Sequence, residues 1–172
     1  MVVGESGSGK DTLVDAVCEK YGYKKLISYT TRPQRNTEKD KKAHKFITKN
    51  EFNKLKNIVA YTYFNDYEYC ATKEQVDEAD FYVIDCCGVN YLKELYVGGK
   101  EIVVVHIDVP KPDRFLRMVE RDGSIKAMER IKYDAKAFAD VKSLCDVAID
   151  NTSKDITGAV EMLHNIIEGK IK

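Results

Sequence analysis

The chain has 172 residues, enough for one domain with a substantial core and too few for two ordinary domains. Its 28 basic and 28 acidic residues cancel, which argues against a nucleic-acid or membrane-surface partner and requires any anion site to be local. The sequence has no signal-like start and no apolar run of membrane-spanning length, so we expect a cytoplasmic protein. No feature of the sequence indicates an oligomeric state.

Apolar segments alternate with helical patterns along the chain, as in βαβ units that build a parallel sheet. The expected strands are residues 1–3, 26–29, 81–85, 101–107 and 147–149. Amphipathic helices are predicted after residue 9 and near the C-terminus, from apolar side chains at helical spacing. We therefore predict an α/β fold of three layers with a five-stranded parallel sheet.

Two regions interrupt this alternation. Residues 32–80 are polar and aromatic, and tyrosines recur at a period of about two around Phe64, which predicts a small antiparallel sheet that binds a second substrate. Residues 118–130 contain a helical pattern, a break at Gly123 and a second helix start, which suits a short lid. We predict a single domain, residues 1–172, with its core at 1–31 and 81–172.

The first turn carries the phosphate-loop pattern G-x-x-x-x-G-K from Gly4 to Lys10. Between a strand and a helix, the backbone N–H groups of such a loop converge on phosphate oxygens, and the lysine reaches the terminal phosphates. The pattern therefore indicates a P-loop NTPase fold with ATP as a substrate. The predicted phosphate ligands are Gly4, Glu5, Ser6, Gly7, Ser8, Gly9, Lys10, Asp11 and Thr12.

Two acidic residues are candidate magnesium ligands. Asp11 occupies the position that the pattern fills with Ser or Thr, and its carboxylate is either a hard oxygen ligand for Mg²⁺ or a favourable charge in the first helical turn. Asp85 ends a buried strand, where the second acidic residue of such enzymes organises magnesium or the second substrate.

Five segments occur in the order and at the spacing of guanylate kinases, which the chain resembles over nearly its whole length. They are GESGSGKDTLV from Gly4, SYTTRPQR from Ser28, HKF from His44, EYCATKE from Glu68 and IDCCGV from Ile84. The resemblance implies a cytoplasmic nucleoside monophosphate kinase that uses ATP and Mg²⁺ and acts on small-molecule nucleotides. GMP or dGMP is the first expected acceptor.

The resemblance also implies roles for individual residues. Ser28, Arg32, Arg35 and Tyr69 would hold the phosphate of the acceptor, and paired guanidinium groups suit that task because they match phosphate oxygens bidentately. Lys10, Arg121 and Arg130 would stabilise the transferring phosphoryl group. Arg114, Arg117 and Arg121 share one helical face, from which they could close over the triphosphate or form surface ion pairs. Asn151 falls in the adenine-side turn.

Several acceptor positions depart from the family pattern. His44 replaces a tyrosine, Ala60 replaces the glutamate that reads the guanine edge, and Ala71 replaces a Ser or Thr, with Thr72 beside it as a substitute. Asp85 would keep one contact near the base. Such departures favour two alternatives: a kinase on the same scaffold with another phosphorylated acceptor, or a catalytically silent binding module. The retained Lys10 and Arg130 favour an active kinase.

The five cysteines are odd in number and lack a C-x-x-C pair. We expect reduced residues of the core, and we interpret the adjacent Cys86 and Cys87 as structural.

Overall fold

The computed structural model describes residues 1–34 and 44–170, which form two compact units. The first comprises Met1–Tyr23, Val83–Cys86 and Ile102–Lys172, and the second comprises Lys24–Tyr82 and Cys87–Glu101. Arg35, a predicted acceptor ligand, lies outside the described residues.

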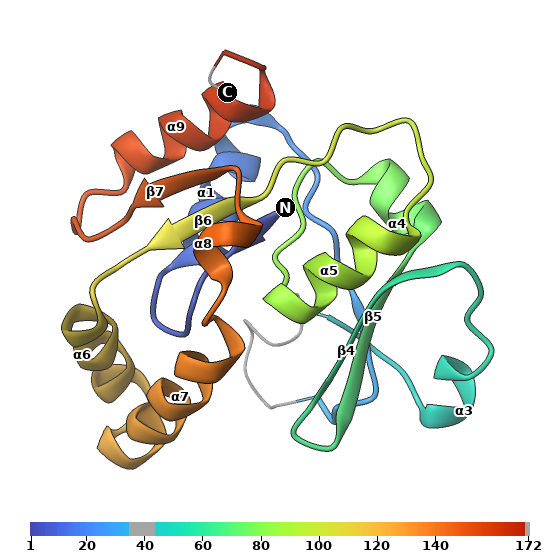
Figure 1. The fold of residues 1–172 in the computed structure, drawn as a ribbon, viewed down its shortest axis with the longest axis horizontal. Helices are drawn as coiled ribbons and strands as arrows, with labels where there is room; N and C mark the ends of the chain where they lie inside the picture. Colours follow the sequence, from blue (N-terminus) through green and yellow to red (C-terminus); the bar gives the residue numbers. More distant parts are fainter. Residues whose placement is uncertain (35–43, 171–172) are drawn as a thin grey trace. The chain divides into compact units, whose positions relative to one another are not determined.

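The first unit is built on a parallel sheet whose strand order is β1-β6-β7 in the described residues (Figure 1). The strands are β1 (Val2–Val3), β6 (Val105–Asp108) and β7 (Val147–Asp150). Each falls in or beside a predicted strand, and Val3, Ile107 and Ile149 are fully buried. Near-continuous apolar sequence is expected here because helices cover both faces of such a sheet.

The prediction of five parallel strands in one sheet was wrong for the part of the chain that the structure describes. Segment 81–85 meets β1 through a single parallel bridge, Val2 to Val83, which is too short to form a strand. Segment 26–29 forms no strand of this sheet either. Beside it, Lys25 meets Phe81 through a single parallel bridge, and the next strand, β2 (Tyr29–Thr30), pairs within the second unit.

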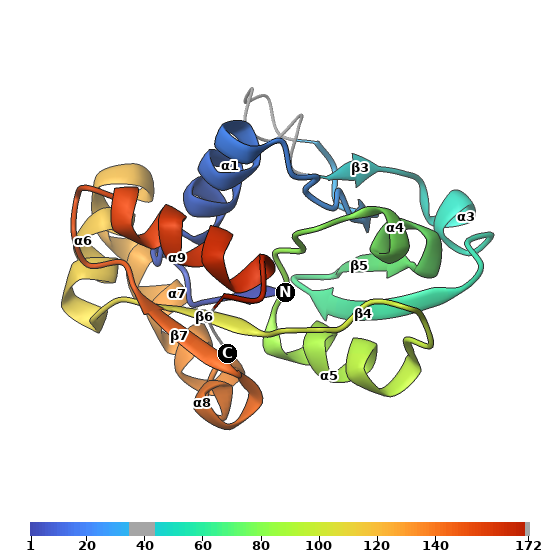
Figure 2. The ribbon, with the colours of Figure 1, turned by 90° about the horizontal axis from the view of Figure 1, so that it is seen from above.

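Helices cover the sheet of the first unit on both faces. Helices α1 (Lys10–Tyr21) and α9 (Thr157–Ile167) pack together on one face, while α8 (Val141–Leu144) lies on the other (Figure 2). Helices α6 (Lys111–Asp122) and α7 (Ser124–Ala137) form a hairpin whose break is Gly123, at φ +84°. No helix within residues 1–34 and 44–170 is long and apolar enough to span a bilayer.

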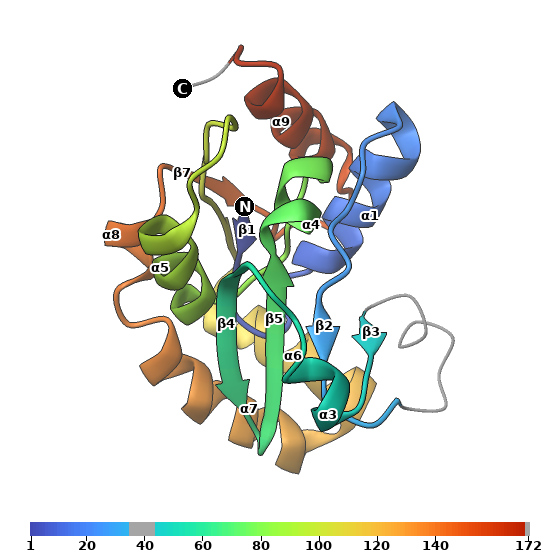
Figure 3. The same ribbon diagram turned by 90° about the vertical axis from the view of Figure 1, so that its right-hand side faces the viewer.

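The second unit contains a sheet in the order β3-β2-β5-β4 (Figure 3). Strands β4 (Ile58–Phe64) and β5 (Tyr67–Thr72) form the predicted antiparallel hairpin, whose two turn residues, Asn65 and Asp66, both have positive φ as a type I′ turn requires. β3 (Lys45–Phe46) instead pairs in parallel with β2, a pairing that the sequence did not predict. The remaining helices are α3 (Lys49–Phe52), α4 (Lys73–Glu78) and α5 (Cys86–Leu95).

Candidate functional site

A cavity of about 280 Å³ opens at the junction of β1 and α1 in the first unit. It is lined by Ser6, Gly7, Gly9, Lys10, Asp11, Thr12, Arg117, Arg121 and Arg130. Residues of the predicted phosphate loop thus lie beside the two arginines predicted to act in catalysis, and beside Arg117 as well. Four cationic side chains and one carboxylate line the cavity, a balance that suits a polyanionic ligand.

The loop needs glycine at two of its positions. Gly7 and Gly9 adopt φ of +81° and +80°, in the left-handed region that other residues rarely occupy. A Cβ atom on Gly7 would lie 2.7 Å from the carbonyl oxygen of Arg114, and one on Gly9 would lie 2.7 Å from Asn151 Nδ2. Both glycines therefore allow α6 and the turn after β7 to pack closely on the loop.

Lys10 is the first residue of α1 and is half-buried at the cavity. Burial lowers the pKa of its ammonium group, and this effect outweighs the opposing influence of Asp11 and Asp134. The positive charges of Arg121 and Arg130 lower it further. An anion bound among these three cations would relieve their mutual repulsion.

Asp122, at the end of α6, contacts two of the arginines that line the cavity. Its Oδ2 atom accepts hydrogen bonds from Arg121 Nε at 2.9 Å and Nη2 at 2.8 Å, and it lies 3.9 Å from Arg130 Nε. The hydrogen bond from Arg121 keeps the pKa of Asp122 below its ordinary value. Sequence reasoning did not single out Asp122, because its position beside Gly123 resembles any charged helix end.

Arg117 and Asn151 brace the phosphate loop from outside. Arg117 Nη2 donates to the carbonyl oxygens of Asn151 and Thr152 at 2.9 and 3.0 Å, and the buried Asn151 side chain donates from Nδ2 to the carbonyl of Ser8 at 2.8 Å. The Asn151 side chain therefore supports the loop, a contact that the sequence did not predict. Its role on the adenine side stays a prediction.

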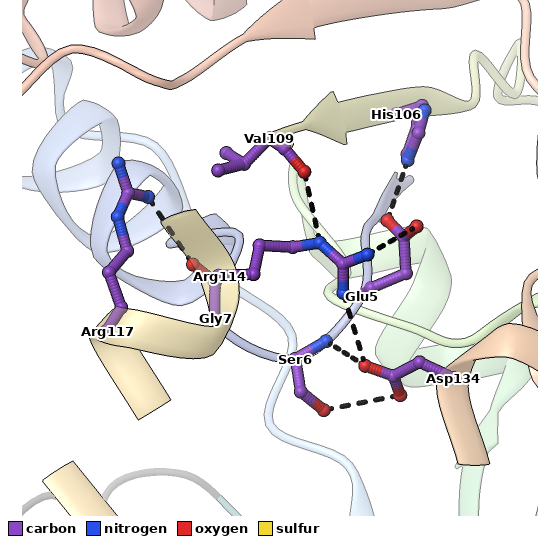
Figure 4. A network of polar contacts seen from close by, with 8 residues as sticks. All are labelled: Glu5, Ser6, Gly7, His106, Val109, Arg114, Arg117 and Asp134. Carbon is purple, nitrogen blue, oxygen red and sulfur yellow. Dashed lines mark hydrogen bonds and ion pairs between the residues drawn. The ribbon is translucent and has the colours of Figure 1, made fainter. Parts of the chain in front are cut away.

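Behind the loop lies a network of four charged or titratable side chains, the half-buried Glu5 and the buried His106, Arg114 and Asp134 (Figure 4). Arg114 Nη2 lies 3.5 Å from Glu5 Oε1, and Arg114 Nη1 lies 3.6 Å from Asp134 Oδ2. The helical spacing of Arg114 suggested a surface ion pair or a group that closes over the triphosphate. Arg114 is neither, because it is buried in this network. Spacing along α6 could not identify its partners, which lie in the loop, on α7 and directly after β6.

Glu5 was predicted as a phosphate ligand through its place in the loop. Its carboxylate is engaged by the network, with His106 Nε2 at 3.0 Å from Oε2. Burial raises the pKa of Glu5, but the hydrogen bonds with His106 and with the backbone, together with the charges of Arg114 and His106, leave the pKa below its ordinary value. Ser8, another predicted loop ligand, is fully buried, and its Oγ atom has no hydrogen-bond partner among the described residues.

The candidate magnesium ligands both belong to the first unit. Asp11 is exposed and lines the cavity beside Thr12, and Asp85 is half-buried directly after Ile84. No group of three or more His, Cys, Asp or Glu side chains gathers into a metal cluster in the described residues. Of the two, Asp11 lines the cavity and Asp85 does not, and a single carboxylate beside substrate phosphates and water is a donor set that Mg²⁺ accepts.

The second unit brings most of the predicted acceptor-phosphate residues together. Ser28 Oγ lies 2.9 Å from His44 Nδ1, and the His44 ring meets Tyr69 edge to face at 5.4 Å. Arg32 lies beside them, with Cζ 5.2 Å from the centre of the Phe46 ring. The sheet explains the cluster, because Thr30 pairs with Phe46 on one side and with Tyr69 on the other.

Two of the positions expected to read the acceptor base, Ala60 and Ala71, carry no polar side chain. Ala60 and Ala71 lie directly opposite each other on β4 and β5, and both are buried. Thr72 is the N-cap residue of α4, where its N–H donates to Gln75 Oε1 at 3.1 Å. Thr72 therefore has a structural task at the helix start, and its contact with a base stays a prediction.

The cysteines differ from one another more than the sequence suggested. None of the five, all of which lie in the described residues, forms a disulfide. Cys70 alone among them is buried, whereas Cys87 is exposed near the start of α5. The expectation of core cysteines was therefore correct for Cys70 and wrong for Cys87, since helix α5 turns Cys87 outward. Burial raises the pKa of the Cys70 thiol to about 12.

Comparison with known proteins gives a consistent family. The model of the guanylate kinase family matches residues 1–170. A guanylate kinase of Fusobacterium nucleatum is 28% identical over 181 residues, covering 100% of this chain and 96% of the relative. The crystal structure of guanylate kinase from Anaplasma phagocytophilum has a TM-score of 0.61 at 21% identity, covering 99% of this chain and 85% of the other. An uncharacterized protein from Eubacterium ventriosum has a TM-score of 0.54 at 13% identity, with coverages of 98% and 96%.

Proposed function

The chain belongs to the guanylate kinase family, and we propose that it transfers the γ-phosphoryl group of ATP to a nucleoside monophosphate. The observation that carries this proposal is the cavity of the first unit, where the glycine loop, Lys10 and three arginines converge. Phosphoryl transfer asks for this kind of site, because its catalysis consists mainly of positioning and of stabilising charge on the transferring group.

In this proposal some residues around the cavity bind the phosphates of ATP and others stabilise the transferring phosphoryl group. The backbone of the loop binds phosphate oxygens, aided by the N-terminus of α1, and Lys10 reaches the terminal phosphates. Arg121 and Arg130 stabilise the negative charge of the transferring phosphoryl group, which electrostatic groups fixed in advance do most effectively. Asp122 orients both arginines before the nucleotide arrives.

The proposed metal is Mg²⁺, held by Asp11 and Asp85. When bound, it supplies positive charge that neutralises the phosphate oxygens of ATP. The exposed carboxylate of Asp11 on the cavity wall supports this assignment over a role confined to the helix end.

The proposed acceptor site uses Ser28, Arg32, Arg35, His44 and Tyr69 for the phosphate, with Asp85 and Thr72 nearer the base. Family membership makes GMP or dGMP the first acceptor to test. The buried Ala60 and Ala71 pair favours a second candidate, another phosphorylated acceptor such as a different deoxynucleotide or a sugar phosphate, because these alanines offer a guanine edge no hydrogen bond.

A panel of acceptors tests the proposal. The full chain is mixed with ATP, Mg²⁺ and each nucleoside monophosphate, deoxynucleotide or sugar phosphate, and the phosphorylated products are separated by anion exchange. We expect product from at least one acceptor, and none with Lys10→Ala. Product from no acceptor, together with ATP binding by calorimetry, would identify the chain as a silent binding module instead.

A further inference from the structure

The phosphate loop is held by side chains of the α6–α7 hairpin that do not line the cavity. We propose that Asp134 is a positioning residue for the nucleotide site: it fixes the loop in its phosphate-binding conformation through the backbone amide of Ser6, while Arg114 balances its charge. This inference rests on the proposed function, because it assumes that the cavity binds the phosphates of ATP.

The contact between Asp134 and the loop is direct. Asp134 Oδ2 accepts a hydrogen bond from the N–H of Ser6 at 2.7 Å, and Oδ1 accepts one from Ser6 Oγ at 3.3 Å (Figure 4). Asp134 is 4% exposed, whereas Ser6 lines the cavity. A hydrogen bond from an amide to a buried carboxylate is charge-assisted and about twice as strong as a neutral one.

A carboxylate buried in this way needs a compensating charge. Arg114 provides it, since its guanidinium group lies between Asp134 and Glu5, at 3.6 and 3.5 Å. Arg114 is itself fixed by a hydrogen bond from Nε to the carbonyl of Val109 at 3.0 Å. Two successive loop residues, Glu5 and Ser6, are therefore attached to α6 and α7 through one buried group of charges.

The same helices carry the arginines of the cavity. Arg130 lies one turn before Asp134 on α7, and Arg117 lies about one turn after Arg114 on α6. Each helix thus uses one turn to hold the loop and a neighbouring turn to line the cavity. Asp134 consequently sets the distance between the loop and the arginines, which must contact the same phosphate groups.

The proposal predicts graded effects for substitutions of Asp134. Asp134→Ala frees the Ser6 amide and leaves Arg114 with Glu5 as its remaining carboxylate, so ATP affinity should fall about 10- to 100-fold. Asp134→Asn keeps an oxygen that accepts from Ser6 but loses the charge, so its loss should be smaller.

The experiment measures the affinity of the full chain for ATP and for inorganic triphosphate by calorimetry, with melting temperatures recorded for every variant. Glu129→Ala is the control, because Glu129 is an exposed acid on the same helix that does not line the cavity. We expect Asp134→Ala to weaken both ligands, Asp134→Asn to weaken them less, and Glu129→Ala to leave both unchanged.

Equal affinity of folded Asp134→Asn and the unaltered chain, with only a lower melting temperature, would overturn the proposal and leave Asp134 a stabilising residue. If Asp134→Ala does not fold, Asp134→Asn decides by the same criterion. The measured affinity does not depend on phosphoryl transfer to an acceptor. If the chain binds ATP but transfers no phosphoryl group, the proposed kinase activity is refuted, and the affinities of the Asp134 variants still test the positioning role. If the unaltered chain bound neither ligand, the positioning role would be refuted as well.

Discussion

Replacing Gly9 by alanine tests how closely the phosphate loop packs against the turn after β7. Gly9 has φ +80°, and a Cβ atom there would lie 2.7 Å from Asn151 Nδ2. Alanine in the left-handed region costs about 1–2 kcal/mol. Displacing the Asn151 amide also breaks its buried hydrogen bond to the Ser8 carbonyl, which costs about 1–3 kcal/mol. The free energy of unfolding should therefore fall by about 2–5 kcal/mol.

A double-mutant cycle separates these two contributions. In an Asn151→Ala background the clash and the hydrogen bond are both absent, so Gly9→Ala should cost only the backbone strain of about 1–2 kcal/mol. Urea unfolding followed by far-ultraviolet circular dichroism measures each variant, since the chain has no tryptophan to report by fluorescence. An equal cost of Gly9→Ala in both backgrounds would refute the packing argument.

Three further predictions concern other parts of the chain. His44→Phe should raise the KM for the acceptor, because it removes the hydrogen bond with Ser28, and His44→Tyr should raise that KM less. Steady-state kinetics with an unchanged KM for His44→Phe would contradict a role of His44 at the acceptor phosphate. Burial raises the pKa of Cys70 to about 12, so in the folded chain at pH 8 Cys70 should resist iodoacetamide while the exposed Cys87 reacts. Peptide mass spectrometry measures both, and faster labelling of Cys70 would contradict the prediction. Since the pKa of Glu5 is lowered in the folded chain, Glu5→Gln should be less stable than the unaltered chain above pH about 5, and this difference in stability should shrink as the pH falls below 4.5. A difference in urea midpoints that stays constant from pH 3 to 7 would rule this out.

The parts of the fold that the sequence predicted are those with a local signal. The glycine pattern located the phosphate loop, and apolar runs located β6 and β7. In β6 the first three residues are buried, and burial on both faces leaves a continuous apolar trace in the sequence. The period of two around Phe64 likewise predicted the β4–β5 hairpin. Each of these signals depends on neighbouring residues and needs no knowledge of distant partners.

The parts that it missed depend on partners far along the chain. The parallel pairing of β2 with β3 joins two-residue strands, too short to show any period. Arg114 resembled its neighbours Arg117 and Arg121 on a charged helix, yet its burial is decided by Glu5 and Asp134. Asp134 itself gave no signal, because an acid within a charged helix is normally solvated.

The central claim is that the cavity around Lys10 delivers the γ-phosphoryl group of ATP to a phosphorylated acceptor. The most direct measurement incubates the full chain with ATP labelled at the γ-phosphate, Mg²⁺ and the acceptor panel, and follows the label by thin-layer chromatography. We predict label in the phosphorylated acceptor with the unaltered chain and with the exposed-site control Lys132→Ala, and none with Lys10→Ala. Label that stays in ATP, or appears only as free phosphate, would contradict the account.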